Sequence, residues 1–214
     1  MCDSKAQAPP RPSDDDAVIT DAPMADHLQA VRSHHRFPGV ARCGVPWELS
    51  HLEPFAFRVD PGLGFEVTVV VLFSCHCFTR SLARDGRTRL AIPSGELFDD
   101  GREVRVLCEE RYELSRRHLP HLIKDLRKRS IQIARDHPPN YVTSVPLDDT
   151  ASVPRRYVVF FEVSRDNKRK GRLILQVQSG YVIEDAPPGR LRARRKISFL
   201  TLLRATALRR RISG

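Results

Sequence analysis

The chain has 214 residues, of which 41% are hydrophobic and 29% charged, and its formal net charge is +10. This composition is typical of a globular protein and excludes a wholly disordered chain, while the longest apolar run, Val67–Phe73, is too short to span a bilayer. No apolar secretory signal is present near the start, so we expect a cytoplasmic protein with reduced cysteines and no membrane partner.

The charge is unevenly distributed along the chain. Residues 1–30 carry two basic and six acidic side chains, a net charge of −4 that leaves +14 for residues 31–214. Residues 186–214 contain nine basic side chains and no acidic one. Such a positive field favours a polyanionic partner, here nucleic acid and specifically RNA, and is also compatible with an acidic protein partner. Solubility alone is the alternative role.

The first 28 residues predict a disordered acidic tail, because proline and aspartate are frequent and no apolar periodicity is present. We expect residues 29–214 to form a single α+β domain. Within it, residues 55–59 predict a strand. Residues 65–73 predict the strongest strand, since β-branched residues without polar alternation suit a central strand buried on both faces. Residues 105–107 predict a further strand after a turn sequence.

The segment after this strand shows helical periodicity. Apolar residues three and four positions apart predict an amphipathic helix with a basic outer face; they are Leu119, Leu122, Ile123 and Leu126. Pro120 suits the first turn of that helix.

The last third of the chain predicts a hairpin of residues 157–163 and 173–177, with the second strand continuing to Ile183. Residues 199–206 then predict a C-terminal helix with arginines opposite its apolar side. The order of strands, helix, strands and helix indicates an α+β fold with a mixed or antiparallel sheet, an amphipathic helix after the first strands and a basic C-terminal helix.

Reactive side chains are concentrated in Ser74–Arg80, directly after the most apolar strand. If the strand continued, Cys75 and Cys77 would share one face and His76 would lie on the other. The thiols would then be small hydrophobic groups of the core, or part of a site.

The functional interpretation of this segment is catalysis on phosphodiesters. His76 can act as a general acid or base near neutral pH. Arg80 and Arg111 can neutralise the phosphate charge that develops during metal-independent cleavage. The alternative is a core strand whose histidine bonds to the backbone.

Thiol and imidazole groups also suggest a metal site, because zinc prefers these ligands. The candidate ligands are Cys75, Cys77, Cys108, His118 and His121. Cys-x-Cys is a less typical spacing than Cys-x-x-Cys and no second close pair is present, so we expect no metal and no other cofactor. A surface histidine pair at a helix start is the alternative for the two histidines.

Nucleic-acid contacts are expected from aromatic and basic side chains late in the chain. The candidates are Tyr112, Tyr181, Arg192, Arg194, Arg195 and Lys196. For the run around Tyr112, residues 109–117, a solvated and salt-bridged face is the alternative. Motifs of P-loop, Rossmann, α/β-hydrolase and HExxH zinc enzymes are absent from the sequence, so these classes lose support.

The region 157–211, with its strands YVVFFEV and LILQVQSGY before a basic helix, resembles in outline the small bacterial toxin ribonucleases of the RelE/BrnT type. The resemblance implies metal-independent RNA cleavage, but no catalytic residue matches and none is carried over. The sequence thus favours a nucleic-acid-directed protein, such as an RNase-like toxin or a phage or plasmid effector. A non-enzymatic nucleic-acid or protein-binding module is the alternative.

Overall fold

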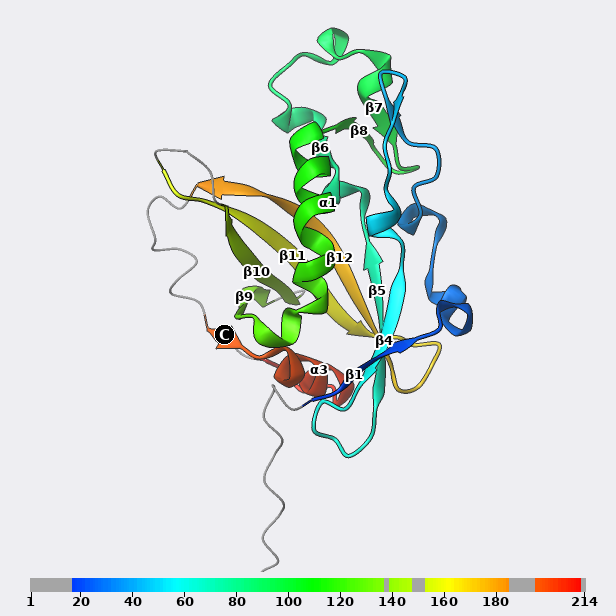
Figure 1. Ribbon diagram of the computed structural model, residues 1–214, viewed down its shortest axis with the longest axis vertical. Coiled ribbons are helices and arrows are strands. Elements are labelled where there is room, and N and C mark those ends of the chain that lie inside the picture. The colour runs from blue at the N-terminus through cyan, green and yellow to red at the C-terminus, as the bar shows by residue number, and fades with distance from the viewer. Residues whose placement is uncertain (1–16, 137–138, 148–152, 185–194, 213–214) are drawn as a thin grey trace, which may run out of the picture.

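A computed structural model describes residues 17–136, 139–147, 153–184 and 195–212 (Figure 1). Its main feature is an eight-stranded sheet in the order β1-β4-β5-β12-β11-β10-β9-β13. β12 pairs in parallel with β5, and the other neighbours are antiparallel. The α+β fold with a mixed sheet is confirmed. The strands are β1 (Ile19–Ala22), β4 (Phe55–Val59), β5 (Val67–Phe73), β9 (Ile131–Asp136), β10 (Pro139–Leu147), β11 (Arg155–Arg165), β12 (Arg172–Glu184) and β13 (Lys196–Ile197).

Smaller elements surround the end of β5. A three-stranded sheet has the order β6-β8-β7, and a two-stranded one pairs β2 with β3. Their bounds are β2 (Ala41–Arg42), β3 (Val45–Pro46), β6 (Thr79–Ser81), β7 (Leu97–Asp99) and β8 (Val104–Leu107). Two short 3-10 helices matter for the site, namely η1 (Met24–Ala30) and η4 (Cys75–Cys77).

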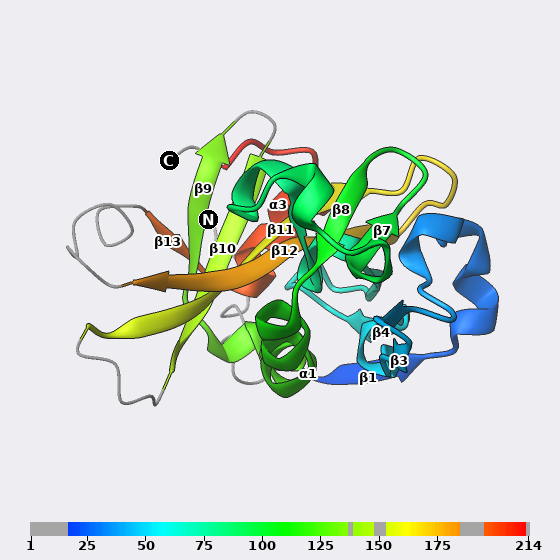
Figure 2. The same cartoon turned by 90° about the horizontal axis from the view of Figure 1, so that it is seen from above.

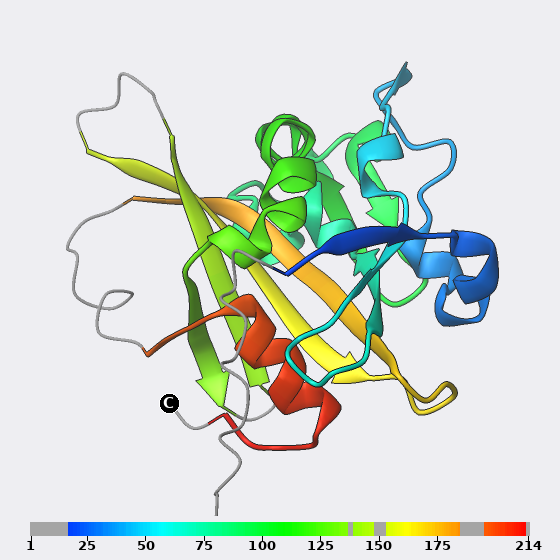
Figure 3. The ribbon, with the colours of Figure 1, turned by 60° about the horizontal axis from the view of Figure 1, so that its bottom comes forward.

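The two faces of the large sheet differ in what covers them. On the first face, α1 (Glu109–Lys124) and α3 (Phe199–Ala207) pack over the main core, and both helices lie in front of the sheet in Figures 1 and 3. From above, α1 is seen against one side of β11 and β12 (Figure 2). On the second face, η1 covers β4 and β5, where Ala56, Val70 and Leu72 form a small cluster. Polar and aromatic side chains of β11 and β12 continue this face.

The helix predicted around Leu119 begins ten residues earlier than expected, at Glu109, so that Pro120 lies inside α1. The run 109–117 is therefore not merely a solvated connection. Tyr112 and Ser115 lie on the same buried side as Leu119, and two glutamates in the first turn complement the helix dipole. Tertiary packing thus outweighs the hydrogen bond lost at Pro120.

The prediction of a disordered tail does not hold for residues 17–28. Residues 1–16 lie outside the described part, but β1 pairs with β4 over four residues and η1 packs beside it. The sequence did not predict this strand because Ile19 to Ala22 is too short a segment to show periodicity. The segment is ordered because it pairs with the edge of the sheet.

The C-terminal helix is confirmed, with Phe199, Leu200, Leu202 and Leu203 buried. Its basic character differs from the prediction. Arg204 is the arginine within α3, and its Nε donates to the carbonyl of Pro61 at 2.6 Å. This arginine therefore fastens the helix to the β4–β5 turn.

We expect Gly180→Ala to destabilise the protein by about 2 kcal/mol, because a Cβ at Gly180 would lie 2.7 Å from Cζ of the fully buried Tyr157. Chemical denaturation measures this loss. In a Tyr157→Leu background the same substitution should cost much less. Equal costs in both backgrounds would contradict the steric explanation.

Candidate functional site

The end of β5 turns into η4 instead of continuing as a strand. Ser74 Oγ accepts a hydrogen bond from the amide of His76 at 3.2 Å and donates to the carbonyl of Gln178 at 2.5 Å. A serine at this position caps the turn. The expectation that the strand continues through Cys77 is therefore wrong, because the local serine cap competes with the strand ladder. Cys75 and Cys77 are nevertheless both buried in the main core, whereas His76 is only half-buried.

His76 lies beside a carboxylate and two arginines. Its Nε2 is 3.5 Å from Oε1 of Glu103, and Glu103 also pairs with Arg105. Burial, reinforced by Arg105, lowers the pKa of His76, so the imidazole is neutral at neutral pH. A neutral imidazole can accept a proton or bind a metal.

Arg111 connects His76 to an aromatic side chain. Its Nη1 donates to the carbonyls of His76 at 3.1 Å and Thr79 at 2.7 Å. Its Cζ lies 5.2 Å from the centre of the Tyr181 ring, a cation–π arrangement. Burial lowers the pKa of Arg111, and no carboxylate among the described residues pairs with it.

These groups line one pocket of about 260 Å³. Its lining contains three guanidinium groups, one imidazole, one phenol and two hydroxyls, from His76, Ser81, Arg84, Arg105, Arg111, Ser179 and Tyr181. The structure thus brings together three separately predicted residues, His76, Arg111 and Tyr181. We call this pocket the arginine pocket.

Next to the arginine pocket, aromatic rings lie on the second face of the sheet. Tyr181 stacks on Phe160 with ring centres 5.5 Å apart and planes 16° apart. Both rings are half-buried. Register places Tyr181 opposite Val158 and Phe160 opposite Ser179, after a bulge at Gln178. This bulge shifts the alternation of β12 and turns Tyr181 toward Arg111.

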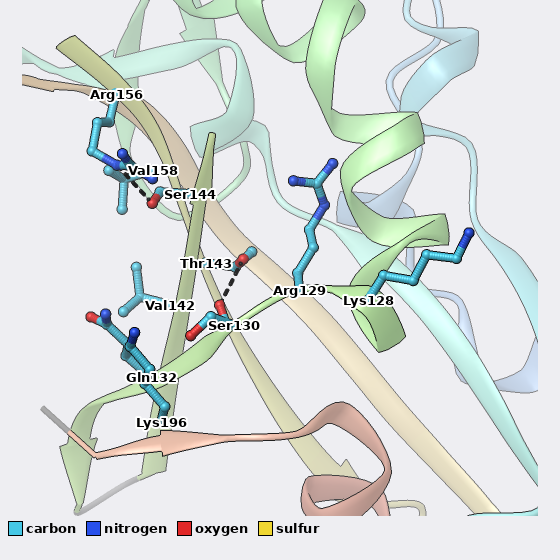
Figure 4. A pocket seen from close by; sticks show the side chains of 10 residues that line it. All are labelled: Lys128, Arg129, Ser130, Gln132, Val142, Thr143, Ser144, Arg156, Val158 and Lys196. Atoms are coloured by element: carbon cyan, nitrogen blue, oxygen red, sulfur yellow. Dashed lines mark hydrogen bonds between the residues drawn. The ribbon is translucent and has the colours of Figure 1, made fainter. Parts of the chain in front are cut away.

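A second pocket of about 410 Å³ lies where β9 stops pairing with β10 (Figure 4). Four basic side chains line it, and none of its described lining residues is acidic; the basic ones are Lys128, Arg129, Arg156 and Lys196. Arg156 Nε donates to Ser144 Oγ at 3.0 Å. The buried Nε of Arg129 has no hydrogen-bond partner in the described part of the chain. We call it the basic pocket, and its chemistry suits an anion.

A third pocket, of about 390 Å³, shares His76 with the arginine pocket. Cys75 Sγ donates to Asp100 Oδ2 at 3.3 Å, and His34 and His35 also line this space. Burial, with a contribution from Asp100, raises the pKa of Cys75 to about 12. The free thiol is therefore protonated and is a poor nucleophile.

Several predicted residues lie outside these pockets. Arg80 Nε is 3.3 Å from Asp85 Oδ2, which places this guanidinium in an ion pair away from the lining of the arginine pocket. Tyr112 is buried and stacks on Trp47 at 4.4 Å, and its hydroxyl accepts from the amide of Glu48. Its role is therefore in packing rather than at the surface.

The predicted basic residues after β12 fall into two groups. Arg192 and Arg194 lie outside the described residues. Arg195 is exposed, and Lys196 in β13 lines the basic pocket.

Of the predicted metal ligands, only Cys75 belongs to a group of three potential ligands, together with His76 and Asp100. Within the described ranges, no such group includes Cys77, Cys108, His118 or His121. Helix α1 holds both histidines in its second half, and His118 packs on Tyr157.

The chain is similar to a known protein family. The model of the YjaZ family matches residues 39–207, about four fifths of the chain. The chain belongs to the YjaZ family. No curated protein and no solved structure matches it.

Membership of the YjaZ family corrects the resemblance to RelE/BrnT toxin ribonucleases. The YjaZ match includes nearly all of the region 157–211 that carried the resemblance. Alternating apolar hairpins followed by a basic helix occur in many α+β proteins, so that pattern was not specific. In the described part of this YjaZ-family chain, no helix has the length and apolar character that crossing a membrane would need.

Sequence reasoning missed two acidic residues of the site. Asp100 and Glu103 follow β7, and their segment was interpreted as a turn. Their proximity to His76 comes from the pairing of β6 with β8, which no local spacing signals.

Proposed function

We propose that this protein binds single-stranded nucleic acid, RNA in particular, on the second face of its sheet. Bases stack on Tyr181 and Phe160, while phosphates contact Arg111 in the arginine pocket and the cations of the basic pocket. The observation that carries the proposal is the stacked pair of half-buried rings with a guanidinium over one of them.

The chemistry of the two ends of this surface supports the proposal. Single strands are bound by aromatic rings on which bases stack, combined with cations that follow the phosphates. Arg111 supplies a guanidinium that no carboxylate of the described residues neutralises, and four cations surround the basic pocket. The rings lie between these cations because Tyr181 pairs with Val158, which lines the basic pocket.

The charge of the chain supports the same partner. The proposal requires that affinity falls with salt, because each phosphate contact releases counterions. The catalytic roles of His76, Arg80 and Arg111 in RNA cleavage stay predictions, and the binding proposal does not depend on them.

We expect Tyr181→Leu to weaken binding of a fluorescein-labelled single-stranded oligouridine about tenfold, since stacking contributes about 1–3 kcal/mol per base. Fluorescence anisotropy at low salt measures the Kd. The matched control is Phe65→Leu, which removes an exposed aromatic ring from the β4–β5 turn outside all three pockets.

The same assay separates charge from stacking. Lys196→Gln should lower the slope of log Kd against log salt by about one, whereas Lys170→Gln, in the β11–β12 turn, should leave the slope unchanged. Equal affinities for Tyr181→Leu and Phe65→Leu would contradict the proposed surface. Binding of polyglutamate but not of oligonucleotides would reject nucleic acid in favour of an acidic protein.

A further inference from the structure

Three side chains that can serve as metal ligands line the pocket beside His34, which shares His76 with the arginine pocket. They are Cys75 and His76 from η4 and Asp100 from the segment after β7. One ligand atom of each lies within 4.8 Å of the others. They form the single such group in the described ranges of the chain.

The backbone fixes these side chains before any ligand binds. The Ser74 cap holds η4, and Thr79 Oγ1 donates to the carbonyl of Cys75 at 2.8 Å. Asp100 Oδ1 accepts from the amides of Arg102 at 2.8 Å and Glu103 at 2.9 Å. Its Oδ2 is thereby directed at the thiol of Cys75, so the carboxylate needs no reorientation.

The donor set and its spacing suit zinc. Zinc takes thiolate, imidazole and carboxylate ligands at about 2.0–2.3 Å in a tetrahedron, which places ligand atoms roughly 3.5 Å apart. Cys75 Sγ and Asp100 Oδ2 are 3.3 Å apart. Glu103 beside the His76 ring is the kind of carboxylate that orients a metal-bound histidine.

We propose that Cys75, His76 and Asp100 bind one zinc ion, with a fourth position open to the pocket. The ion replaces the proton that the Cys75 thiol shares with Asp100, and that proton is released to solvent. Thiolate and carboxylate together balance the charge of Zn²⁺. Three protein ligands and an open position are the arrangement of zinc sites that bind a water or a substrate. The proposal is independent of nucleic-acid binding.

Cobalt titration tests the site. Full-length protein is treated with a chelator and titrated with Co²⁺, with the sulfur-to-cobalt charge-transfer band followed by absorbance. We expect one equivalent to give the band in the wild type. Cys75→Ser should abolish the band, and Asp100→Asn should raise the Kd for Co²⁺ at least tenfold.

The control is Cys77→Ser, since Cys77 is a fully buried thiol two residues away that is not part of the group. This variant should keep the band at unchanged stoichiometry. Melting temperatures establish that each variant is folded, and Asp100→Asn tests the site if Cys75→Ser does not fold. Absence of the band in folded wild type would overturn the proposal, as would an unchanged Kd in Asp100→Asn.

Discussion

Asp166→Ala is expected to lower the free energy of unfolding by about 3–5 kcal/mol, because it leaves a buried guanidinium without its partner. Arg172 is 2% exposed, and its Nε donates to Asp166 Oδ2 at 2.6 Å. The same guanidinium lies 3.4 Å from Nδ1 of His27, which is also buried. Asp166 thus neutralises the charge of Arg172, and Arg172 in turn links the β11–β12 turn to η1 through His27.

Urea unfolding measures the loss for Asp166→Ala. The matched control is Glu113→Gln, which breaks the exposed pair between Glu113 and Arg116 and should cost less than about 0.5 kcal/mol. Combining Asp166→Ala with Arg172→Met should recover most of the stability, since no buried charge is then left unpaired. An equal loss of unfolding free energy for Asp166→Ala and Glu113→Gln would contradict the prediction that the buried pair stabilises the fold more than an exposed pair does.

Stability is expected to fall by about 4 kcal/mol between pH 7.5 and pH 5, because His35 and His51 must stay neutral in the fold. Burial is the main cause that lowers the pKa of each to about 4. After burial, the largest contributions that lower the pKa come from the charges of His34 and Arg32 for His35, and from the charge of Arg116 for His51.

Hydrogen bonds agree with neutral rings at both positions. His35 Nδ1 accepts from the amide of Arg32 at 3.1 Å, so a proton on Nδ1 would remove that bond. His51 Nε2 lies 2.8 Å from Ser115 Oγ, whose own proton goes to the carbonyl of Tyr112. Nε2 is therefore the donor, and the buried Nδ1 of His51 has no hydrogen-bond partner among the residues that the structure describes.

The direction of the pH dependence follows from the pKa values of these histidines in the unfolded and in the folded chain. The unfolded chain takes up protons near pH 6.5, whereas the folded chain does so near pH 4, so the stabilisation is complete above about pH 6.5 and is lost as the pH falls toward 4. Carboxylates with lowered pKa values titrate below this window.

Denaturation of chelator-treated protein at several pH values measures this slope. His51→Gln should remove about 2 kcal/mol of this fall, which is the share of one histidine whose pKa drops from 6.5 to about 4. A slope that is the same in wild type and His51→Gln would contradict the assignment.

Continuous apolar runs explain which elements the sequence could predict. The run 67–73 is buried on both faces as β5, and the hairpin of β11 and β12 matches its two apolar runs. β10 was not predicted because Tyr141 to Leu147 mixes polar and apolar residues and follows two prolines. Its order comes from the ladder with β11, which is a long-range interaction.

The residues of the candidate site were likewise only partly predictable from the sequence. Residue types pointed to His76, Arg111 and Tyr181 one at a time, each from its own segment. Tyr112 carried the same local signal, yet it faces Trp47 in the core. No property of a single segment separates Tyr181 from Tyr112, because the difference lies in which neighbours each ring meets.

The sequence by itself determined an α+β protein with strong positive charge, a central apolar strand and a cluster of reactive side chains where that strand ends. Its composition and short-range periodicity were sufficient for this, since burial and local propensity act within a few residues. Only the tertiary structure decided that Asp100 and Glu103 come to His76 and that Arg111 lies over Tyr181. These contacts join residues distant in the sequence, and the strand pairings that create them leave no local signal.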